Sequence, residues 1–124
     1  MLDMLQEFQG KTVTFVEQIQ VRDGVVCDVY VFKDDDTCDL GIITIDPGAK
    51  TPKQKVLEGK QTVEGYLNGQ GFFIHNKSKY QVNSETEFVL TIGDTMQWQA
   101  GDNGLQSYEI CYPPYKDGRF ENLE

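Results

Sequence analysis

Apolar and polar residues alternate with a period of two along most of the chain, which is the spacing of a β-strand with one buried face. Residues 11–15 and 25–31 follow this pattern, and Asp23-Gly24 between them predicts a hairpin, because glycine tolerates a positive φ. Leu40–Ile45 is a further predicted strand, which ends where Asp46-Pro47-Gly48 imposes a turn.

The second half of the chain continues the same pattern. Thr62–Leu67 and Gly71–Ile74 flank Asn68-Gly69, the strongest hairpin dipeptide in the sequence, and this arrangement predicts a second hairpin. Further strands are expected at residues 80–82, 87–92, 95–99 and 105–112, with turns at Gly93-Asp94 and Gly101–Gly104. Many short strands separated by glycine-containing turns indicate an all-β sandwich or jelly-roll barrel.

The two ends of the chain fall outside the alternating pattern. Residues 2–8 predict a short N-terminal arm or one or two helical turns, which are too short to be stable without packing on the body. Residues 119–124 are compatible with either a docked or a frayed tail. No repeat, low-complexity tract or linker divides the sequence, so we expect a single domain over residues 1–124.

The chain is acidic, with a net charge of −9 and only 11 lysine and arginine residues. This charge repels the phosphate backbone and anionic membrane surfaces, so we expect neither nucleic acid nor a membrane as a partner. No apolar run approaches the roughly 20 residues that span a bilayer. No basic segment followed by an apolar stretch marks a secretory signal, so we expect a soluble cytoplasmic protein.

The cysteines agree with this expectation. Cys27, Cys38 and Cys111 are widely separated and form no Cys-x-x-Cys pair. Their number and spacing argue against a disulfide framework and against a structural zinc site, and they fit a reducing compartment. We interpret each cysteine as a small buried or half-buried hydrophobic residue.

Two segments resemble the two conserved blocks of the cupin superfamily. The first is Asp46–Pro52, with the sequence DPGAKTP, followed after a strand by Glu64–Gly71, with the sequence EGYLNGQG. The second joins the Ile92-Gly93-Asp94 turn to Ile110–Tyr115, with the sequence ICYPPY. The resemblance is to small single-domain cupins of the RmlC-like jelly-roll type, and it implies a double-stranded β-helix barrel.

The resemblance also implies where a metal would bind, and the expected ligands are missing. It places the first two histidines of the superfamily at Gln54 and Val56, which lack a good donor for a transition metal, whereas Glu64 is placed to supply the carboxylate. Trp98–Gly104, near the third histidine position, contains no imidazole. The single histidine, His75, lies outside both blocks, and we interpret it as an exposed or hydrogen-bonded strand residue. We therefore expect no metal and no cofactor.

Strand alternation puts Gln54 and Val56 on one face, and by analogy with cupins that face lines the barrel interior. The same alternation places Thr62, Glu64 and Tyr66 together on the face that lines the barrel interior. A buried Glu64 needs a hydrogen-bond partner or has a raised pKa, and either condition makes it a candidate acid or base. The simpler alternative is that Glu64 pairs with a lysine at the barrel mouth, among Lys53, Lys55 and Lys60.

Aromatic residues on the late strands complete the candidate pocket. Alternation sends Gln97 and Trp98 to opposite faces, and likewise Tyr108 and Glu109, but does not tell which set faces the pocket. Aromatic rings beside amides and carboxylates suit a sugar, and they are equally typical of an ordinary core. The candidate ligand-binding residues are Gln54, Val56, Thr62, Glu64, Tyr66, Trp98 and Tyr108.

Lys53, Lys55 and Lys60 are concentrated in a chain otherwise rich in acid. They are compatible with the attraction of an anionic ligand to one rim of the barrel. A solvated edge strand whose lysines discourage aggregation explains the same residues more simply. The sequence leaves both interpretations open.

Three functions are compatible with these features. The leading hypothesis is a metal-free cupin that binds a small organic molecule, a sugar or a carboxylic acid, in its barrel. The second is a metal-independent isomerase, epimerase or lyase acting on a carbohydrate-like substrate, with Glu64 and either Tyr66 or Tyr108 as the acid–base pair. The third is an interaction protein that forms a homodimer through exposed edge strands.

Overall fold

The computed structural model describes residues 4–124, which form ten β-strands and no helix. The strands are β1 (Glu7–Phe8), β2 (Lys11–Arg22), β3 (Val25–Phe32), β4 (Asp35–Ile45), β5 (Gln54–Val56), β6 (Gln61–His75), β7 (Ser78–Gln81), β8 (Glu87–Leu90), β9 (Thr95–Tyr112) and β10 (Phe120–Asn122). The predicted all-β class is confirmed. Among the residues so described, no helical segment has the length and hydropathy needed to cross a bilayer.

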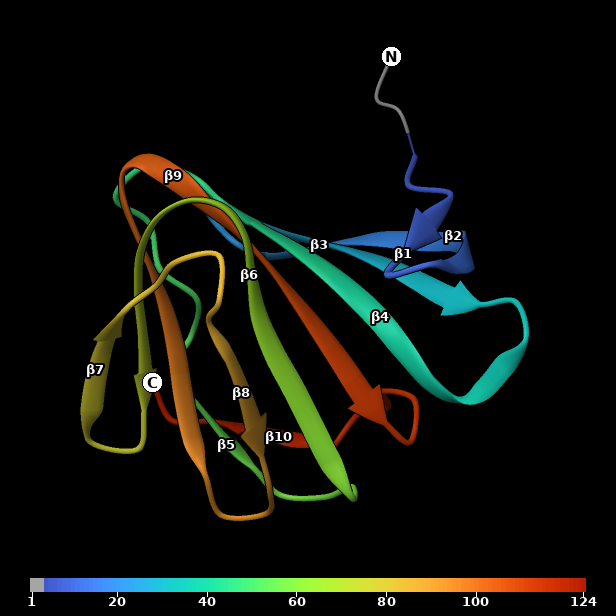
Figure 1. Cartoon of the computed structure of the whole chain (residues 1–124). Coiled ribbons are helices and arrows are strands. Elements are labelled where there is room, and N and C mark those ends of the chain that lie inside the picture. The colour runs from blue at the N-terminus through green and yellow to red at the C-terminus, as the bar shows by residue number, and fades with distance from the viewer. Residues whose placement is uncertain (1–3) are drawn as a thin grey trace.

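All the strands belong to one antiparallel sheet. Its main order is β1-β2-β3-β4-β9-β5-β10, and β6 pairs with β7, β8 and β9. Figure 1 shows this sheet curled on itself, with the short strands β5, β7, β8 and β10 on one side of the molecule and β1 and β2 on the opposite side. The curl encloses a barrel interior.

The long strands β6 and β9 bend together, and this bend corrects two predictions. Asn68-Gly69 is not a hairpin turn, because β6 runs on from Gln61 to His75, and Gly101–Gly104 likewise lies within β9. The two glycine-rich segments face each other, and four residues of β9 bulge opposite Gln70. A Cβ on Gly69 would lie 2.3 Å from the Gly104 carbonyl oxygen, so the glycines serve a close approach at a corner and not a reversal of the chain.

The other predicted turns are present. Asp23-Gly24 joins β2 to β3 with Gly24 at a φ of 80°, and the chain turns at Pro47-Gly48 and at Ile92-Gly93. At the N-terminus, residues 4–6 form an arm without regular structure that leads into β1, so the helical alternative is wrong for residues 4–8. Residues 2 and 3 lie outside the described part of the chain.

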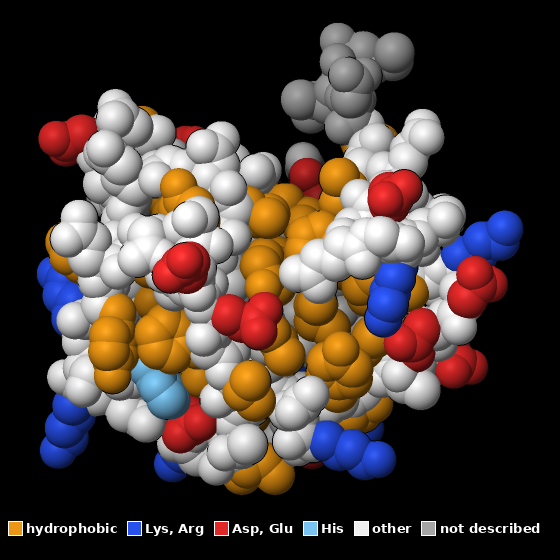
Figure 2. All heavy atoms as spheres, in the orientation of Figure 1, with side chains coloured by type: hydrophobic (Ala, Val, Ile, Leu, Met, Phe, Trp, Pro, Cys, Tyr) orange, Lys and Arg blue, Asp and Glu red, His pale blue; other side chains and the backbone are white. Residues whose placement is uncertain are grey.

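Two apolar clusters occupy opposite faces of β4 and β9. One fills the barrel interior and contains Val25, Ile43, Phe73, Trp98 and Leu105 among others. The second lies on the outer face and contains Phe8, Tyr30, Ile42, Tyr108 and Ile110 among others. Figure 2 shows hydrophobic side chains gathered in a hollow over this outer face, between β6 and the β1–β2 arm.

The C-terminal tail is docked. β10 pairs with β5, and the buried Arg119 guanidinium just before it donates hydrogen bonds to the carbonyl oxygens of Gln61, Tyr112 and Pro113 and to Thr62 Oγ1. Arg119 thereby ties the end of β9 and the start of β6 to the tail. This brace closes the bottom of the barrel.

The bend of β6 and β9 makes a prediction about stability. A Cβ on Gly71 would lie 2.1 Å from the Gln99 carbonyl oxygen, whereas a Cβ on Gly101 would meet its nearest atom, the Gln70 carbonyl oxygen, at 3.3 Å. Gly71→Ala should therefore lower the free energy of unfolding by about 1–3 kcal/mol, measured by urea denaturation. The matched control Gly101→Ala should cost less, and equal losses would contradict the close approach.

Candidate functional site

A cavity of about 320 Å³ opens into the barrel between β2–β4 and the β5–β10 pair. Its walls are mostly apolar, and its polar groups come from the start of β4, the end of β9 and the segment before β5. The lining residues discussed below are Gln20, Val25, Cys27, Val29, Asp39, Gly41, Ile43, Thr51, Gln54, Glu109, Cys111, Tyr115 and Phe120. The volume is at the lower end of the range for small-molecule pockets.

Strand register places three acidic residues next to one another on the interior face. Glu109 on β9 lies directly opposite Glu64 on β6 and opposite Gly41 on β4. One step along, Asp39 lies opposite Cys111, which makes Asp39 a diagonal neighbour of Glu109. Gly41, the β4 residue opposite Glu109, has no side chain. The Glu109 side chain is therefore not covered from β4 and keeps access to the cavity.

Glu64 is the fully buried member of this group. Its Oε1 accepts a hydrogen bond of 2.8 Å from the Trp98 indole, and its Oε2 has no hydrogen-bond partner. Burial raises the pKa of Glu64 well above its ordinary value of 4.5, and the nearby charge of Glu109 and contact with that carboxylate raise it further. Two adjacent carboxylates cannot both stay charged in so dry a place, so Glu64 holds the proton of the pair.

Glu109 is the half-buried member, and it is the one that lines the cavity. The Cys111 thiol donates to its Oε1 over 3.2 Å. Glu109 therefore presents its carboxyl group to the cavity, with the buried Glu64, whose pKa is raised, directly behind it. Such a pair can bind a donor group, and it can also give and accept protons.

Asp39 is buried at the start of the same wall. Its Oδ2 accepts the backbone N–H of Tyr115 over 3.0 Å, which holds the segment after β9 against the cavity. Burial raises the pKa of Asp39; the Tyr115 hydrogen bond opposes this effect, the charge of Glu109 adds to it, and Arg119 again opposes it. Burial prevails, so the pKa of Asp39 lies above its ordinary value and its carboxyl group holds a proton more readily than an exposed aspartate does.

The two cysteines of the cavity are unsuited to nucleophilic attack. Burial, followed by the charge of Glu109, raises the pKa of Cys27 to about 12, and the same causes raise the pKa of Cys111. Both residues therefore remain thiols at neutral pH. All three cysteines are free and buried or half-buried, as the sequence indicated.

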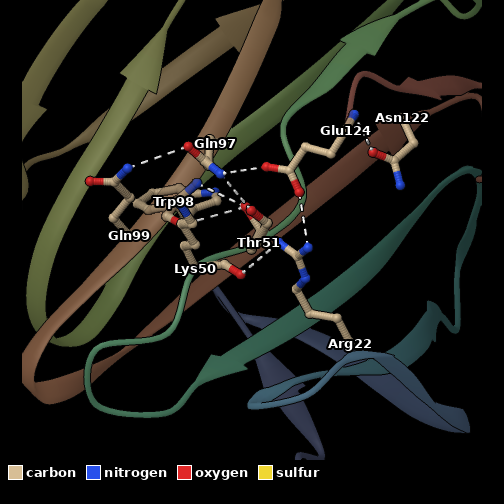
Figure 3. A network of polar contacts seen from close by, with 8 residues as sticks. All are labelled: Arg22, Lys50, Thr51, Gln97, Trp98, Gln99, Asn122 and Glu124. Carbon is tan, nitrogen blue, oxygen red and sulfur yellow. Dashed lines mark hydrogen bonds and ion pairs between the residues drawn. The ribbon is translucent and has the colours of Figure 1, made fainter.

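One edge of the cavity is held by a polar network (Figure 3). The Thr51 backbone N–H donates to the Trp98 carbonyl oxygen, and the Thr51 hydroxyl accepts the Trp98 backbone N–H, each over 2.9 Å. Gln97 Nε2 donates to the Thr51 carbonyl oxygen and to Glu124, which also forms a 2.9 Å ion pair with Arg22. This network fixes the position of Trp98, and Trp98 in turn holds Glu64.

Six of the seven predicted ligand-binding residues lie on the interior side of the barrel. Thr62 and Glu64 are fully buried, Val56 and Trp98 belong to the interior cluster, and Tyr66 packs against it. Only Gln54 lines the cavity itself. The Tyr66 hydroxyl donates to the Gly69 carbonyl oxygen over 2.8 Å and is thereby engaged in the corner of β6.

Tyr108 is the exception, and the structure does not bring it to the site. It lies on the outer face, over Gly65 and edge-on to Phe8, with its hydroxyl donating to Glu87 over 2.5 Å. Strand alternation explains this placement, because Glu109 faces inward and its neighbour Tyr108 must face outward. Tyr108 is therefore separated by the sheet from Glu64, its expected acid–base partner.

Two other expectations about charged groups have clear outcomes. Glu64 is held by Trp98 and forms no ion pair with a lysine, because the ion pairs among residues 4–124 are Arg22–Glu124 and His75–Asp94. His75 is the hydrogen-bonded strand residue that the sequence suggested, with Nε2 at 3.4 Å from Asp94. Lys53, Lys55 and Lys60 are exposed.

Sequence reasoning missed much of the site. Asp39, Tyr115 and Phe120 were not singled out, and Glu109 was left with its face undecided. The available signal was the alternation of β9, where Glu109 and Cys111 share one face. Whether this face of β9 points into the barrel depends on the pairing of β9 with β6, which brings together residues far apart in the sequence.

The metal site implied by the cupin resemblance does not fit these residues. Val56 is buried and has no donor, and Glu64 Oε1 is already occupied by the Trp98 N–H. Within the described chain, no group of three or more His, Cys, Asp or Glu side chains is arranged to hold a metal ion.

Comparison with known proteins supports the fold. No protein-family model and no curated protein matches the sequence. A salicylate 1,2-dioxygenase from Pseudaminobacter salicylatoxidans aligns with a TM-score of 0.63 and 18% identity over 74% of this chain, which spans only 27% of the dioxygenase chain. A Streptomyces Pac13 variant solved with uridine aligns with a TM-score of 0.68 and 12% identity, over 95% of this chain and 92% of that chain.

A further Pac13 structure, described as that of a unique nucleoside dehydratase, aligns with a TM-score of 0.66 and 11% identity, over 87% of this chain and 84% of that chain. At these identities the likeness shows the fold alone. The chain has a cupin-like β-barrel fold, as its sequence blocks indicated.

The buried pair makes a prediction about pH. A raised pKa means that folded Glu64 binds a proton that the unfolded chain has released, so stability should fall as pH rises above 4.5, the ordinary pKa of Glu64, and Asp39 acts in the same direction. Glu64→Gln keeps an acceptor for Trp98 and removes this loss. It should stabilise the protein at about pH 8 by roughly 1 kcal/mol or more, measured by urea denaturation.

The matched control is Glu85→Gln, which makes the same change of charge at an exposed position between β7 and β8. It should leave the slope of stability against pH unchanged. An unchanged slope in Glu64→Gln would show that Glu64 ionises normally in the folded protein.

Proposed function

We propose that this protein is a metal-free member of the cupin-like barrels that binds a small organic molecule in the cavity beside Glu109. The observation that carries the proposal is the Glu64–Glu109 pair: a fully buried acid held by Trp98, directly behind a carboxylate that lines a 320 Å³ cavity. An ordinary core gains nothing from two acids in contact, whereas a binding site uses them to recognise donors.

The charge of the cavity favours some ligands over others. Its acidic lining residues, Asp39 and Glu109, oppose the entry of a carboxylic acid, which was one of the two ligand classes expected from the sequence. Hydroxyl groups can donate to both carboxyls, while the apolar walls and the Tyr115–Phe120 rings cover a carbon frame. A hydroxyl-bearing molecule such as a sugar suits this lining better. The homodimer and the cytoplasmic location stay predictions of the sequence.

Ligand binding can be tested by NMR with two neutral probes, uridine and D-glucose. We expect at least one probe to shift the methyl resonances of Val25, Val29 and Ile43, which line the cavity. Val29→Phe adds a ring to the cavity wall and should abolish the shifts, while Val89→Phe on the exposed side of β8 should leave them. Shifts that persist in Val29→Phe would contradict binding in this cavity, and the absence of shifts with both probes would contradict a neutral hydroxyl-bearing ligand.

A second candidate is acid–base catalysis, which the unequal protonation of Glu64 and Glu109 favours. Glu109, which lines the cavity, can take a proton from a substrate carbon and return the same proton to the product, while the buried Glu64 in contact with it adjusts its affinity for the proton. An isomerase, epimerase or lyase would then use Glu109 in place of the tyrosines expected from the sequence. Among the structural neighbours, Pac13 is a nucleoside dehydratase, so a barrel of this fold supports an elimination in that protein.

Acid–base catalysis predicts that kcat/KM differs between two variants, Glu109→Gln and Tyr108→Phe. For a substrate identified by deuterium exchange at its acidic C–H group, Glu109→Gln should lower kcat/KM by about 10²–10⁴-fold. Tyr108→Phe should change it little, because Tyr108 faces away from the cavity. A large loss in Tyr108→Phe with an active Glu109→Gln would contradict the assignment.

A further inference from the structure

The cavity is acidic and contains no positive charge of its own. Its lining residues include Asp39 and Glu109 but no lysine, arginine or histidine. The two nearest arginines among residues 4–124 are engaged elsewhere: Arg22 pairs with Glu124, and Arg119 is buried and donates to backbone carbonyl oxygens. The acids of the cavity therefore have no counter-ion in direct contact.

Polar groups deeper in the same wall are also unsatisfied. Glu64 Oε2 and Ser107 Oγ are fully buried and have no hydrogen-bond partner. Both side chains face the interior, since Glu64 lies opposite Glu109 and Ser107 is two residues from Glu109 on the same strand. Neither residue lines the cavity, but Glu64 contacts Glu109, which does, so a positive charge at Glu109 also acts on the buried acid.

The mouth of the cavity adds an aromatic surface. Tyr115 and Phe120 both line it and stack with their ring centroids 6.0 Å apart and their planes 22° from parallel. The faces of such rings attract a cation and cover an apolar or ring-shaped frame. Val29 and Ile43 continue this apolar surface toward the acids.

We propose that the ligand is an organic cation, a protonated amine on a small ring-shaped or apolar frame, whose ammonium group binds between Asp39 and Glu109. This inference rests on the proposed binding function and names its ligand class. An ammonium group supplies the missing counter-charge and up to three hydrogen-bond donors. A neutral sugar supplies donors alone, and the donor set does not fit a metal ion.

Binding of a cation should also displace protons from the acids. Glu109 is faced by Glu64 on β6, Asp39 on β4, Cys27 on β3, Cys111 on β9 and the more distant Arg119. A positive charge among them favours the ionised carboxylates, so proton release should accompany binding below about pH 7. A neutral ligand would not cause this release.

The test uses three probes that share one frame: benzylamine, benzyl alcohol and benzoate. Calorimetric titrations in buffers of different ionisation enthalpy give the dissociation constant and the number of protons released, and NMR of the Val29 and Ile43 methyl groups locates the site. We expect benzylamine to bind roughly tenfold or more tightly than benzyl alcohol, with benzoate weakest and proton release for the amine alone.

Variants separate the possible outcomes. Glu109→Gln and Asp39→Asn should each remove most of the preference for the amine, whereas Glu85→Gln, with the same charge change at an exposed site, should retain it. Equal affinity for the amine and the alcohol, or a preference that survives Glu109→Gln and Asp39→Asn, overturns the inference but leaves the binding function standing. If no probe shifts the cavity methyl groups, the inference and the proposed cavity both fail.

Discussion

The interior of this barrel depends on a cross-strand pair of acids. Glu64 and Glu109 face each other on β6 and β9, and the Trp98 indole donates a hydrogen bond to Glu64 Oε1. Two charges in this position would repel, so the fold tolerates the pair only because Glu64 keeps its proton. The buried pair of acids lowers the stability of the folded protein at neutral pH, and it places acidic groups in the wall of the cavity.

The strands that carry this pair separate two surfaces. On β9, Glu109 and Cys111 face the cavity while Tyr108 and Ile110 pack with Phe8 and Ile42 on the outer face. The corner of β6 and β9 brings both strands around the barrel, and the Arg119 brace holds their ends. Rigid β-structure on each side therefore positions the acids, which is a better support for recognition than a mobile loop.

Much of the fold was predictable from local patterns, but its corners were not. Asp23-Gly24 and Pro47-Gly48 turn the chain as their sequences indicate, whereas Asn68-Gly69 satisfies the same rule and lies within a continuous strand, because its partner Gly104 needs the space. The candidate site could likewise be predicted only in part from local patterns. Glu64 was recognised from alternation and the cupin blocks, but its partner Glu109 emerges only from long-range register.

Burial against Glu109 raises the pKa of Glu64 well above its ordinary value, and the structure of the barrel interior depends on this shift. The direct measurement is an NMR titration of the side-chain carboxyl carbons in selectively labelled protein, with Glu64→Gln used to assign the Glu64 resonance. We expect the Glu64 carboxyl to remain protonated well above 4.5, its ordinary pKa. A Glu64 carboxyl that ionises together with the exposed glutamates would contradict it.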